Sequence, residues 1–396
     1  MVKTALLTLG RMPKGLTVAR ALKTAGWRVV VADPLGWHLS RSSRAVDRSV
    51  KVTAPRTDAA AYRKDVLRIV AEEAVALIVP IADEIVHAAG VVPDLPAGTA
   101  LFGLPQAQLI TLYDKAQFMA LAHTHGMRVP ASAPLGDTAA DHLAEASDTV
   151  VKRVNGCSGV GLTWVGRGQS LPHPSGDPML VQTRIRGREV SSFSITHQGR
   201  VLVTVVYEAT VTSGTVSVAF QRVTGPVAQT VAEDVARFVA STSLTGFVSF
   251  DFIVDSAGAA WAIECNPRVT SGVHFVDPSD LAQAITAPDR VETVRLTGRD
   301  RYQQIFPTWL EAYAALFQKG RSAGPIFREL LTARDVTWDR RDPWPLLLMT
   351  VTSHEILGRA IRSGISLGEA ATADILWQAG DQPAKDPIAP EAPGCG

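Results

Sequence analysis

Two carboxylates, an amide and a guanidinium lie close together in the second half of the chain. The segment "WAIECNPRVTSGVHF", residues 261–275, begins like a buried strand and then presents Glu264, Asn266 and Arg268 at alternate positions. Asp251 interrupts the preceding apolar segment, "GFVSFDFIV". Between the two segments, "DSAG" has the composition of a tight turn, so we predict a β-hairpin.

The predicted hairpin separates polar from apolar side chains, because neighbouring residues of a strand point to opposite faces. Asp251, Glu264 and Asn266 are expected on one face. The side chains expected to face apolar packing are Phe250, Phe252, Ile263 and Cys265. Two carboxylates and an amide oxygen are hard donors that suit Mg²⁺, and Arg268 could hold an anion beside them. The alternative is a solvated hairpin face that carries ordinary surface charges.

Length and composition limit the kinds of function. The 396 residues suffice for two or three domains. The net charge is +1 and no basic block stands out, so no nucleic-acid partner is expected. No apolar run approaches the length of a membrane span, so no membrane partner is expected either. Cys157, Cys265 and Cys395 are scattered, which favours a cytoplasmic location over a disulfide framework or a zinc site.

Residues 1–104 alternate strand and helix patterns. The apolar runs "TALLTL", "RVVVAD" and "VALIVP" are separated by stretches with helical spacing. This order predicts a parallel sheet with helices on both faces. Asp33 ends the second strand as in a dinucleotide-binding domain, but "LGRMPKGLTVAR" lacks the G-x-G-x-x-G fingerprint. We therefore expect an α/β domain that binds no nucleotide.

The remaining chain divides into three parts. Residues 105–290 begin with a helical stretch and continue with sequential antiparallel strands and an amphipathic helix, which is an α+β pattern. Residues 291–380 are expected to be mainly helical, and residues 381–396, rich in Pro, Ala and Gly, to be disordered. The helical region could be a substrate cover or a dimer surface, but core positions are expected for its tryptophans, which are Trp309, Trp338, Trp344 and Trp377.

Four segments, in this order, resemble the ATP-grasp superfamily in its carbamoyl-phosphate-synthetase-like, amino-acid-ligase branch. "LYDKAQFMALAHTHGMRVP" resembles the helix whose lysine precedes the nucleotide domain, and "VVKRVNGCSGVGL" resembles the strand, lysine and glycine-rich lid loop. "LVQTRIRGREVS" resembles the hinge strand with its G-x-E, and "GFVSFDFIVDSAGAAWAIECNPR" resembles the metal-binding hairpin. The resemblance spans residues 112–272 and implies two α+β subdomains that follow an N-terminal α/β domain.

The resemblance also implies roles for single residues. The family uses two lysines for the nucleotide phosphates, a lid loop over them, a hinge against adenine and a glutamate for the ribose. The residues that match these ATP contacts are Lys115, Lys152, Ser158, Gly159, Gln182, Thr183, Ile185 and Glu189. Asp251, Glu264 and Asn266 match the Mg²⁺ ligands, with Mn²⁺ as an alternative ion. Arg268 matches the arginine that steadies an acyl phosphate and, with Lys152, is expected to be catalytic.

The implied activity joins a small carboxylic acid to an amine at the expense of ATP, giving an amide, ADP and phosphate. Substrate contacts are expected at Glu84, Arg222 and His274, although a packing role fits His274 equally well. Residues 45–62 and the C-terminal region also resemble ligases of mycosporine-type amino-acid pathways, which favours small-molecule biosynthesis. Homodimers are common among such proteins.

Three other functions compete with the ligase. One is a carboxylase or carbamoyl-phosphate-type enzyme that uses bicarbonate as the acid. Another is a kinase that stops at the phosphorylated acid. The third is an ATP-binding protein without a catalytic role. The full set of phosphate, ribose and metal residues favours an enzyme.

Overall fold

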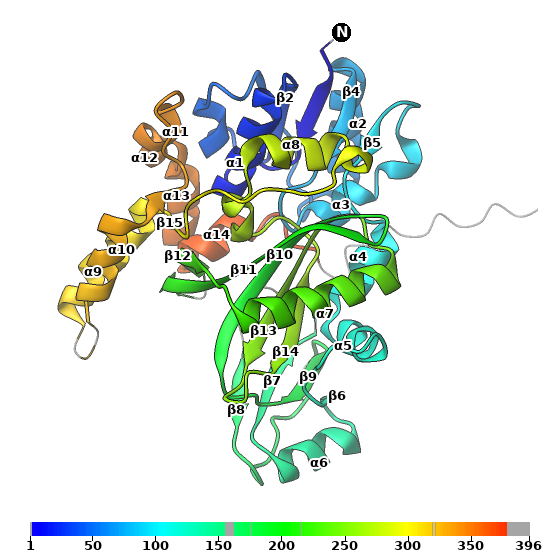
Figure 1. The fold of residues 1–396 in the computed structure, drawn as a ribbon, viewed down its shortest axis with the longest axis vertical. Helices are drawn as coiled ribbons and strands as arrows, with labels where there is room; N and C mark the ends of the chain where they lie inside the picture. Colours follow the sequence, from blue (N-terminus) through cyan, green and yellow to red (C-terminus); the bar gives the residue numbers. More distant parts are fainter. Residues whose placement is uncertain are drawn as a thin grey trace, which may run out of the picture.

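The computed structural model describes residues 2–154, 162–174, 176–214, 216–318, 320 and 322–377. These residues form three sheets with helices packed around them (Figure 1). The predicted lid loop, with Ser158 and Gly159, and the predicted disordered tail, 381–396, lie outside the described residues. Within the described part of the chain, no helix combines the length and the apolar composition needed to cross a bilayer.

The N-terminal sheet is parallel and has the strand order β3-β2-β1-β4-β5, which confirms the predicted α/β fold. Its central strand is buried at every position, as expected where helices cover both faces. The strands are β1 (Thr4–Leu7), β2 (Arg28–Asp33), β3 (Arg48–Lys51), β4 (Val75–Val79) and β5 (Ala100–Leu101), and the helices are α1 (Pro13–Thr24), α2 (Ala59–Glu72) and α3 (Ile85–Ala89).

Asp33, at the end of β2, is enclosed by donors from the loop that follows β1. Its carboxylate accepts the backbone N–H groups of Gly10, at 2.9 Å, and Arg11, at 3.0 Å. The guanidinium of Arg11 lies 2.7 Å from Asp33 and 2.7 Å from Asp374. The acid that meets a ribose in dinucleotide-binding domains is therefore occupied by protein groups here. The same arginine ties the end of the described chain to this sheet.

Two helices and a four-stranded antiparallel sheet follow. The helical stretch at residues 105–126 is two helices, α4 (Gln106–Tyr113) and α5 (Lys115–Thr124), because Asp114 ends the first and caps the second. The sheet has the order β6-β9-β7-β8 and packs against α6 (Thr138–Ala146). Its strands are β6 (Ser132–Pro134), β7 (Thr149–Arg153), β8 (Thr163–Val165) and β9 (Met179–Thr183).

The largest sheet has seven strands in the order β14-β13-β10-β11-β12-β15-β16, and it contains the predicted hairpin as β13 and β14. Its strands are β10 (Arg188–His197), β11 (Arg200–Ser213), β12 (Val216–Arg222), β13 (Gly246–Val254), β14 (Ala260–Asn266), β15 (Arg301–Gln303) and β16 (Arg334–Asp335). The last two strands fall within residues 291–380, so part of the region expected to be helical extends this sheet.

Two helices pack around this sheet and the N-terminal part of the chain. Helix α7 (Pro226–Thr242) packs on β11, and α8 (Pro278–Thr286) packs on α1. One apolar core contains Leu22 of α1, Phe193 of β10 and Leu281 of α8. The N-terminal sheet and the seven-stranded sheet therefore share a core instead of being linked only through the chain.

The C-terminal region carries several exposed aromatic side chains. Trp309, Trp338 and Trp344 are 50%, 43% and 45% exposed, so the expectation that they are core residues is wrong. Trp377 is partly buried and packs against an apolar core. The helices are α9 (Ile305–Phe317), α10 (Gly324–Thr332), α11 (Trp344–Leu347), α12 (Met349–Thr352), α13 (His354–Ser363) and α14 (Leu367–Thr372).

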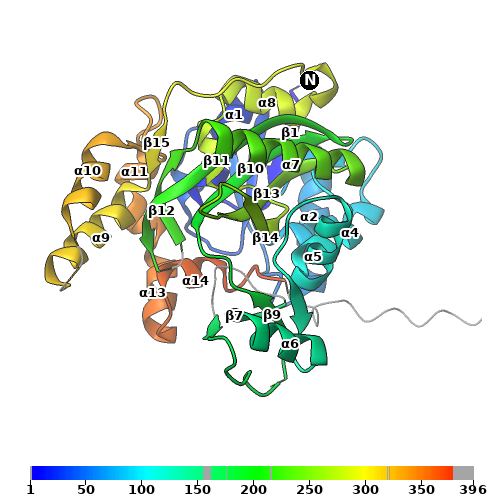
Figure 2. The ribbon, with the colours of Figure 1, turned by 60° about the horizontal axis from the view of Figure 1, so that its bottom comes forward.

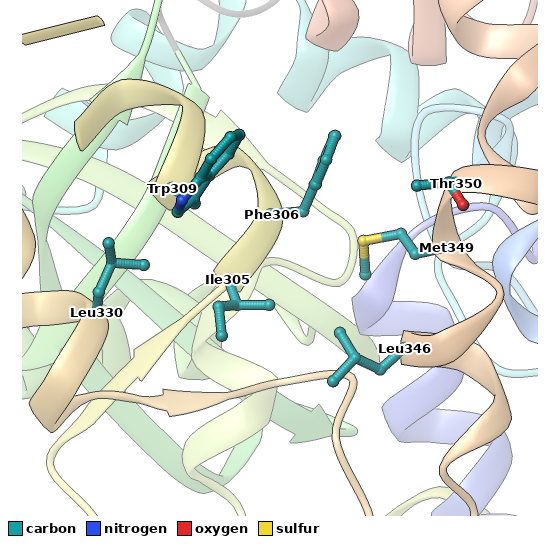
Figure 3. Close-up of a pocket in the computed structure, with 7 residues that line it drawn as sticks. All are labelled: Ile305, Phe306, Trp309, Leu330, Leu346, Met349 and Thr350. Atoms are coloured by element: carbon teal, nitrogen blue, oxygen red, sulfur yellow. The ribbon is translucent and has the colours of Figure 1, made fainter. Parts of the chain in front are cut away.

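Helices α9 and α10 lie at the edge of the molecule (Figure 2), where they pack on β11 and β12 of the seven-stranded sheet. An apolar cavity of about 400 Å³ separates them from α11 and α12. Figure 3 shows Phe306 and Trp309 of α9 on one side of this cavity and Met349 and Thr350 of α12 on the other.

His274 packs between the two large sheets instead of facing solvent. It lies in a 3₁₀ turn (Ser271–Phe275) and is 7% exposed. Its Nδ1 is 2.8 Å from the hydroxyl of Thr17, and its ring stacks on Phe220 with a centroid distance of 5.8 Å. Burial, together with the positive charges of Lys14 and Arg20, lowers the pKa of His274 to about 3. The histidine therefore stays neutral in the folded protein.

This burial predicts a loss of stability in mild acid. Below a pKa of about 6.5 the unfolded histidine gains a proton, whereas the folded one stays neutral down to about pH 3. Between pH 6 and pH 5 the free energy of unfolding should fall by about 1 kcal/mol more in the wild type than in His274→Gln. Urea titrations at both pH values measure this difference. His142→Gln, which removes a 79% exposed histidine side chain, should follow the wild type; equal pH dependence of His274→Gln and the wild type would contradict the prediction.

Candidate active site

The hairpin of β13 and β14 brings its two carboxylates face to face. Asp251 pairs directly with Glu264, and Ser249 pairs with Asn266. The register then shifts, because Phe252 pairs with Ala262 and leaves Ile263 as the extra residue of a β-bulge.

The bulge changes which residues face the core. Ala262 is fully buried and joins the apolar core with Phe250, Phe252 and Cys265. Ile263 is only partly buried, so the expectation that it faces this core is wrong. The simple alternation of side chains fails at this position because one extra residue reverses it.

The same bulge brings the carbonyl of Ile263 to Lys152 on β7. Lys152 Nζ donates to this oxygen at 3.1 Å and to Gln182 Oε1 at 2.9 Å. The lysine is 7% exposed. Burial and the neighbouring Lys115 lower its pKa to about 8, and Glu264 and Asp251 oppose that shift.

Lys115 reaches the hairpin from a different element, α5. It is the first residue of α5, whose N-terminus is held by Asp114 accepting the N–H of Gln117 at 2.9 Å. Its Nζ lies 3.5 Å from Glu264 Oε1, and the residue is 7% exposed. Two cations from separate elements therefore cover the polar face of the hairpin, so that face is not an open surface as the alternative interpretation required.

Asp251 is the most constrained carboxylate of the site. Ser191 Oγ donates to it at 2.6 Å, and Asn266 Nδ2 donates at 2.9 Å. Burial and the charge of Glu264 raise its pKa to about 6. Both effects oppose a second negative charge, so a cation between the two carboxylates would be favourable.

The donor set fits a magnesium ion. Among the residues described, no three His, Cys, Asp or Glu side chains cluster as a closed metal site. The candidate ligands are two carboxylates and the amide oxygen of Asn266. Such a partial set of hard oxygen donors suits Mg²⁺, which usually completes its shell with water and substrate phosphates.

Arg268 connects the hairpin to the N-terminal domain. Its Nη2 donates to Asn266 Oδ1 at 3.0 Å, and its Nε donates to Asp83 Oδ1 at 2.7 Å. Tyr113 also donates to Asp83, at 3.1 Å. Burial would raise the pKa of Asp83, but the charges of Arg268 and Lys14 outweigh burial and lower it.

Glu84, the substrate candidate, lies beside Asp83 in sequence but has a different environment. It is fully buried and accepts the Thr8 hydroxyl at 2.9 Å and the N–H of Ile81 at 2.7 Å. Its carboxylate therefore stabilises the loop after β4 inside the N-terminal domain by hydrogen bonds. Asp83, which sequence reasoning missed, is the residue of this pair that reaches the hairpin.

The predicted adenine hinge, Gln182, Thr183 and Ile185, lies at the end of β9 and just beyond it. The Gln182 side chain is 2% exposed and bridges Lys152 and Ser132, whose Oγ accepts from Gln182 Nε2 at 2.9 Å. This amide therefore orients Lys152. The N–H of Thr183 donates to Ala131 O at 2.8 Å, so that donor is used within the protein. Ile185 is partly buried in the connection to β10.

Glu189 lies near the start of β10, opposite Ile253 of the hairpin, and is exposed. Gly187 explains why this strand can approach the hairpin so closely. A Cβ at that position would collide with the carbonyl of Val254. The G-x-E spacing thus places a solvent-accessible carboxylate beside the strands of the hairpin. Its negative charge contributes to the raised pKa of Asp251.

The structure brings seven of the predicted site residues together and places three others elsewhere. The residues around the hairpin carboxylates are Lys115, Lys152, Gln182, Asp251, Glu264, Asn266 and Arg268. Arg222 donates to Asp300 at 2.9 Å, whereas Glu84 and His274 occupy the interior contacts described above. Ser191 was missed, although it lies two residues after Glu189 and therefore on the same face of β10.

Comparison with known proteins finds one sequence family that matches part of the chain. A family model of the ATP-grasp domain matches residues 112–272. No curated protein sequence gives a significant match.

Several solved structures share the fold at low sequence identity. The biotin carboxylase domain of 2-oxoglutarate carboxylase from Hydrogenobacter thermophilus has a TM-score of 0.60 and 16% identity, over 75% of this chain and 73% of that one. N5-carboxyaminoimidazole synthetase from Staphylococcus aureus has a TM-score of 0.61 and 13% identity, over 81% of this chain and 86% of that one. Biotin carboxylase from Campylobacter jejuni has a TM-score of 0.61 and 15% identity, over 75% of this chain and 74% of that one.

These likenesses concern the fold, and the sequence match concerns the segment that contains the lysines and the hairpin. Residues 112–272 of this chain match the family model of the ATP-grasp domain, and the solved structures share its fold.

Proposed function

We propose that the protein is an ATP-dependent carboxylate–amine ligase that forms ADP and phosphate. The observation that carries the proposal is the convergence of two buried lysines, two opposed carboxylates and an arginine from separate elements. Lys115 and Lys152 lie against the hairpin that holds Glu264, and Arg268 follows it. This arrangement suits a polyphosphate and a divalent ion held side by side.

The lysines would hold the nucleotide phosphates. Each is almost buried, and burial disfavours an ammonium unless anions surround it. The pKa of Lys152 is lowered to about 8 with only protein carboxylates nearby. Phosphate oxygens beside this nitrogen would favour its charged form. Gln182 keeps Lys152 pointed toward the hairpin by a hydrogen bond of 2.9 Å.

Asp251, Glu264 and Asn266 would hold Mg²⁺, which supplies charge neutralisation at the phosphates when bound. In the proposed reaction an oxygen of the carboxylate substrate attacks the γ-phosphorus, and the bond to the ADP oxygen breaks. The amine then attacks the acyl carbon, phosphate leaves and the nitrogen loses a proton. Arg268 would orient and stabilise the transferred phosphoryl group. The acid and amine partners would be small molecules, as expected for biosynthesis in the cytoplasm.

The direct test is an assay of the full chain with Mg-ATP and a panel of small carboxylic acids and amines, alone and in pairs. We expect ADP and phosphate release that needs both partners, together with a product whose mass equals acid plus amine minus water. Release with a single acid and no condensed product would contradict the ligase and indicate a kinase. ADP binding without turnover under any pairing would favour a non-catalytic role.

A carboxylase is the second candidate, because one structure with the same fold is a biotin carboxylase domain solved with MgADP and bicarbonate. Bicarbonate therefore belongs in the same panel as an acid. Release of ADP that requires bicarbonate, with the mass of the acceptor increased by that of carbon dioxide, would replace the ligase with this alternative. The metal and phosphate residues would keep their proposed roles in either case.

Removal of one hairpin charge should abolish turnover without unfolding the protein. For Glu264→Gln and for Arg268→Ala we expect kcat to fall by about 100-fold or more, the effect of losing a group that stabilises developing charge. Glu292→Gln, at an exposed loop position, is the matched control and should keep the wild-type rate. Thermal unfolding would establish that all variants are folded. Wild-type activity in either site variant would contradict the proposed site.

Removal of the charge of Lys152 should weaken nucleotide binding. Lys152→Met keeps the apolar stem and removes the charge, so the Kd for Mg-ADP should rise roughly 10- to 100-fold, the range for losing a charged hydrogen bond. Lys51→Met, at an exposed position on β3, should leave the Kd unchanged. Isothermal titration calorimetry measures both values. An unchanged Kd in Lys152→Met would show that this lysine does not contact the nucleotide.

A further inference from the structure

Arg268 is anchored by residues from two domains. Asn266, on the hairpin, accepts from its Nη2, and Asp83, in the loop after β4 of the N-terminal sheet, accepts from its Nε. Asp83 and Arg268 are 185 residues apart in sequence. The Asp83 side chain is 5% exposed and that of Arg268 is 14% exposed, so this ion pair lies inside the protein.

We propose that Asp83 is a positioning residue that aims the guanidinium of Arg268 at the transferred phosphoryl group. This inference rests on the proposed function, since it concerns the arginine assigned to that group. A carboxylate would repel a phosphate, so Asp83 acts through Arg268 and does not bind substrate. A guanidinium is planar, and two acceptors at different nitrogens fix both its plane and its direction.

Tyr113 makes the position of Asp83 well defined. It donates to the same carboxylate oxygen, at 3.1 Å, that accepts from Arg268. Tyr113 ends α4, and the next residue, Asp114, caps the helix that begins with Lys115. The carboxylate of Asp83 thus links the N-terminal sheet to Tyr113, two residues before Lys115, and to Arg268.

A second contact from the N-terminal domain holds the backbone beside the arginine. Lys14, near the start of α1, donates from Nζ to Val269 O at 2.7 Å. Its charge also helps to lower the pKa of Asp83. Both the side chain and the following carbonyl are therefore held by residues of the first domain. The N-terminal domain therefore orients Arg268 within the site.

The test is the binding of inorganic phosphate to the full chain saturated with Mg-ADP, measured by calorimetry for a double-mutant cycle. Asp83→Ala should raise the Kd for phosphate about tenfold, the effect of losing a charge-assisted contact. Asp83→Asn keeps an acceptor oxygen and should raise it by about threefold, because a neutral acceptor bonds about half as strongly. The Kd for Mg-ADP should stay within about twofold of wild type in each variant, since Asp83 acts only through Arg268.

The cycle is completed by Arg268→Ala. This variant should bind phosphate more weakly than the wild type, and adding Asp83→Ala to it should change the Kd no further, because the arginine that Asp83 positions is gone. Asp280→Ala is the matched control. It removes the carboxylate from another ion pair, with Arg295 at 2.7 Å, and should leave phosphate binding unchanged.

The outcomes separate this inference from the proposed function. Weaker phosphate binding in Arg268→Ala together with wild-type binding in both Asp83 variants would overturn the positioning role alone. An equal loss from Asp83→Ala with and without Arg268 would also overturn it, because the two residues would then act independently. Unchanged binding in Arg268→Ala, or no phosphate binding by the wild type, would overturn the assignment of Arg268 and the inference with it. If Asp83→Ala does not fold, Asp83→Asn decides the question.

Discussion

The site depends on holding two carboxylates opposite each other on neighbouring strands. Asp251 and Glu264 repel each other, and burial adds to that cost, which is why the pKa of Asp251 rises to about 6. The protein offsets the repulsion with donors of three kinds: the hydroxyl of Ser191, the amide of Asn266 and the ammonium of Lys115. These groups come from different elements, so the positions of those elements follow from this one constraint.

A single extra residue in β14 allows the hairpin to hold the two carboxylates opposite each other. The bulge at Ile263 keeps Glu264 opposite Asp251 while Ala262 fills the apolar face. It also brings a backbone carbonyl to Lys152, whose other partner is the amide of Gln182. The four-stranded sheet and the seven-stranded sheet are thereby linked through one lysine. A β-bulge changes the direction of the backbone groups beside it, and bulges are common near active sites.

The N-terminal domain and the hairpin belong to one structural unit. Asp83 holds Arg268, Thr17 contacts His274, and a common apolar core runs between the sheets. Helices α9 and α10 pack on the seven-stranded sheet but leave large side chains exposed, among them Phe317 at 72% and Leu331 at 87%. The end of the described chain returns to the N-terminal sheet through Asp374, which pairs with Arg11.

The sequence alone was sufficient to predict the parallel sheet, the hairpin and the chemical character of the polar face of the hairpin. These features depend on turn composition and on the period of apolar residues, which are local properties. The match of four separate segments to one family then assigned single residues within that frame. The match also included Gln182 as a hinge residue, although its side chain forms a hydrogen bond that orients Lys152.

Only the tertiary structure decided which of two adjacent acids reaches the site. Asp83 and Glu84 are alike in sequence, but one meets Arg268 and the other is enclosed by Thr8 and backbone N–H groups. The bulge at Ile263, the packing of His274 and the exposure of Trp309 likewise depend on contacts between distant segments. The physical reason is that the local pattern sets which face a side chain takes, whereas its partner is set by the packing of elements that are distant in the sequence.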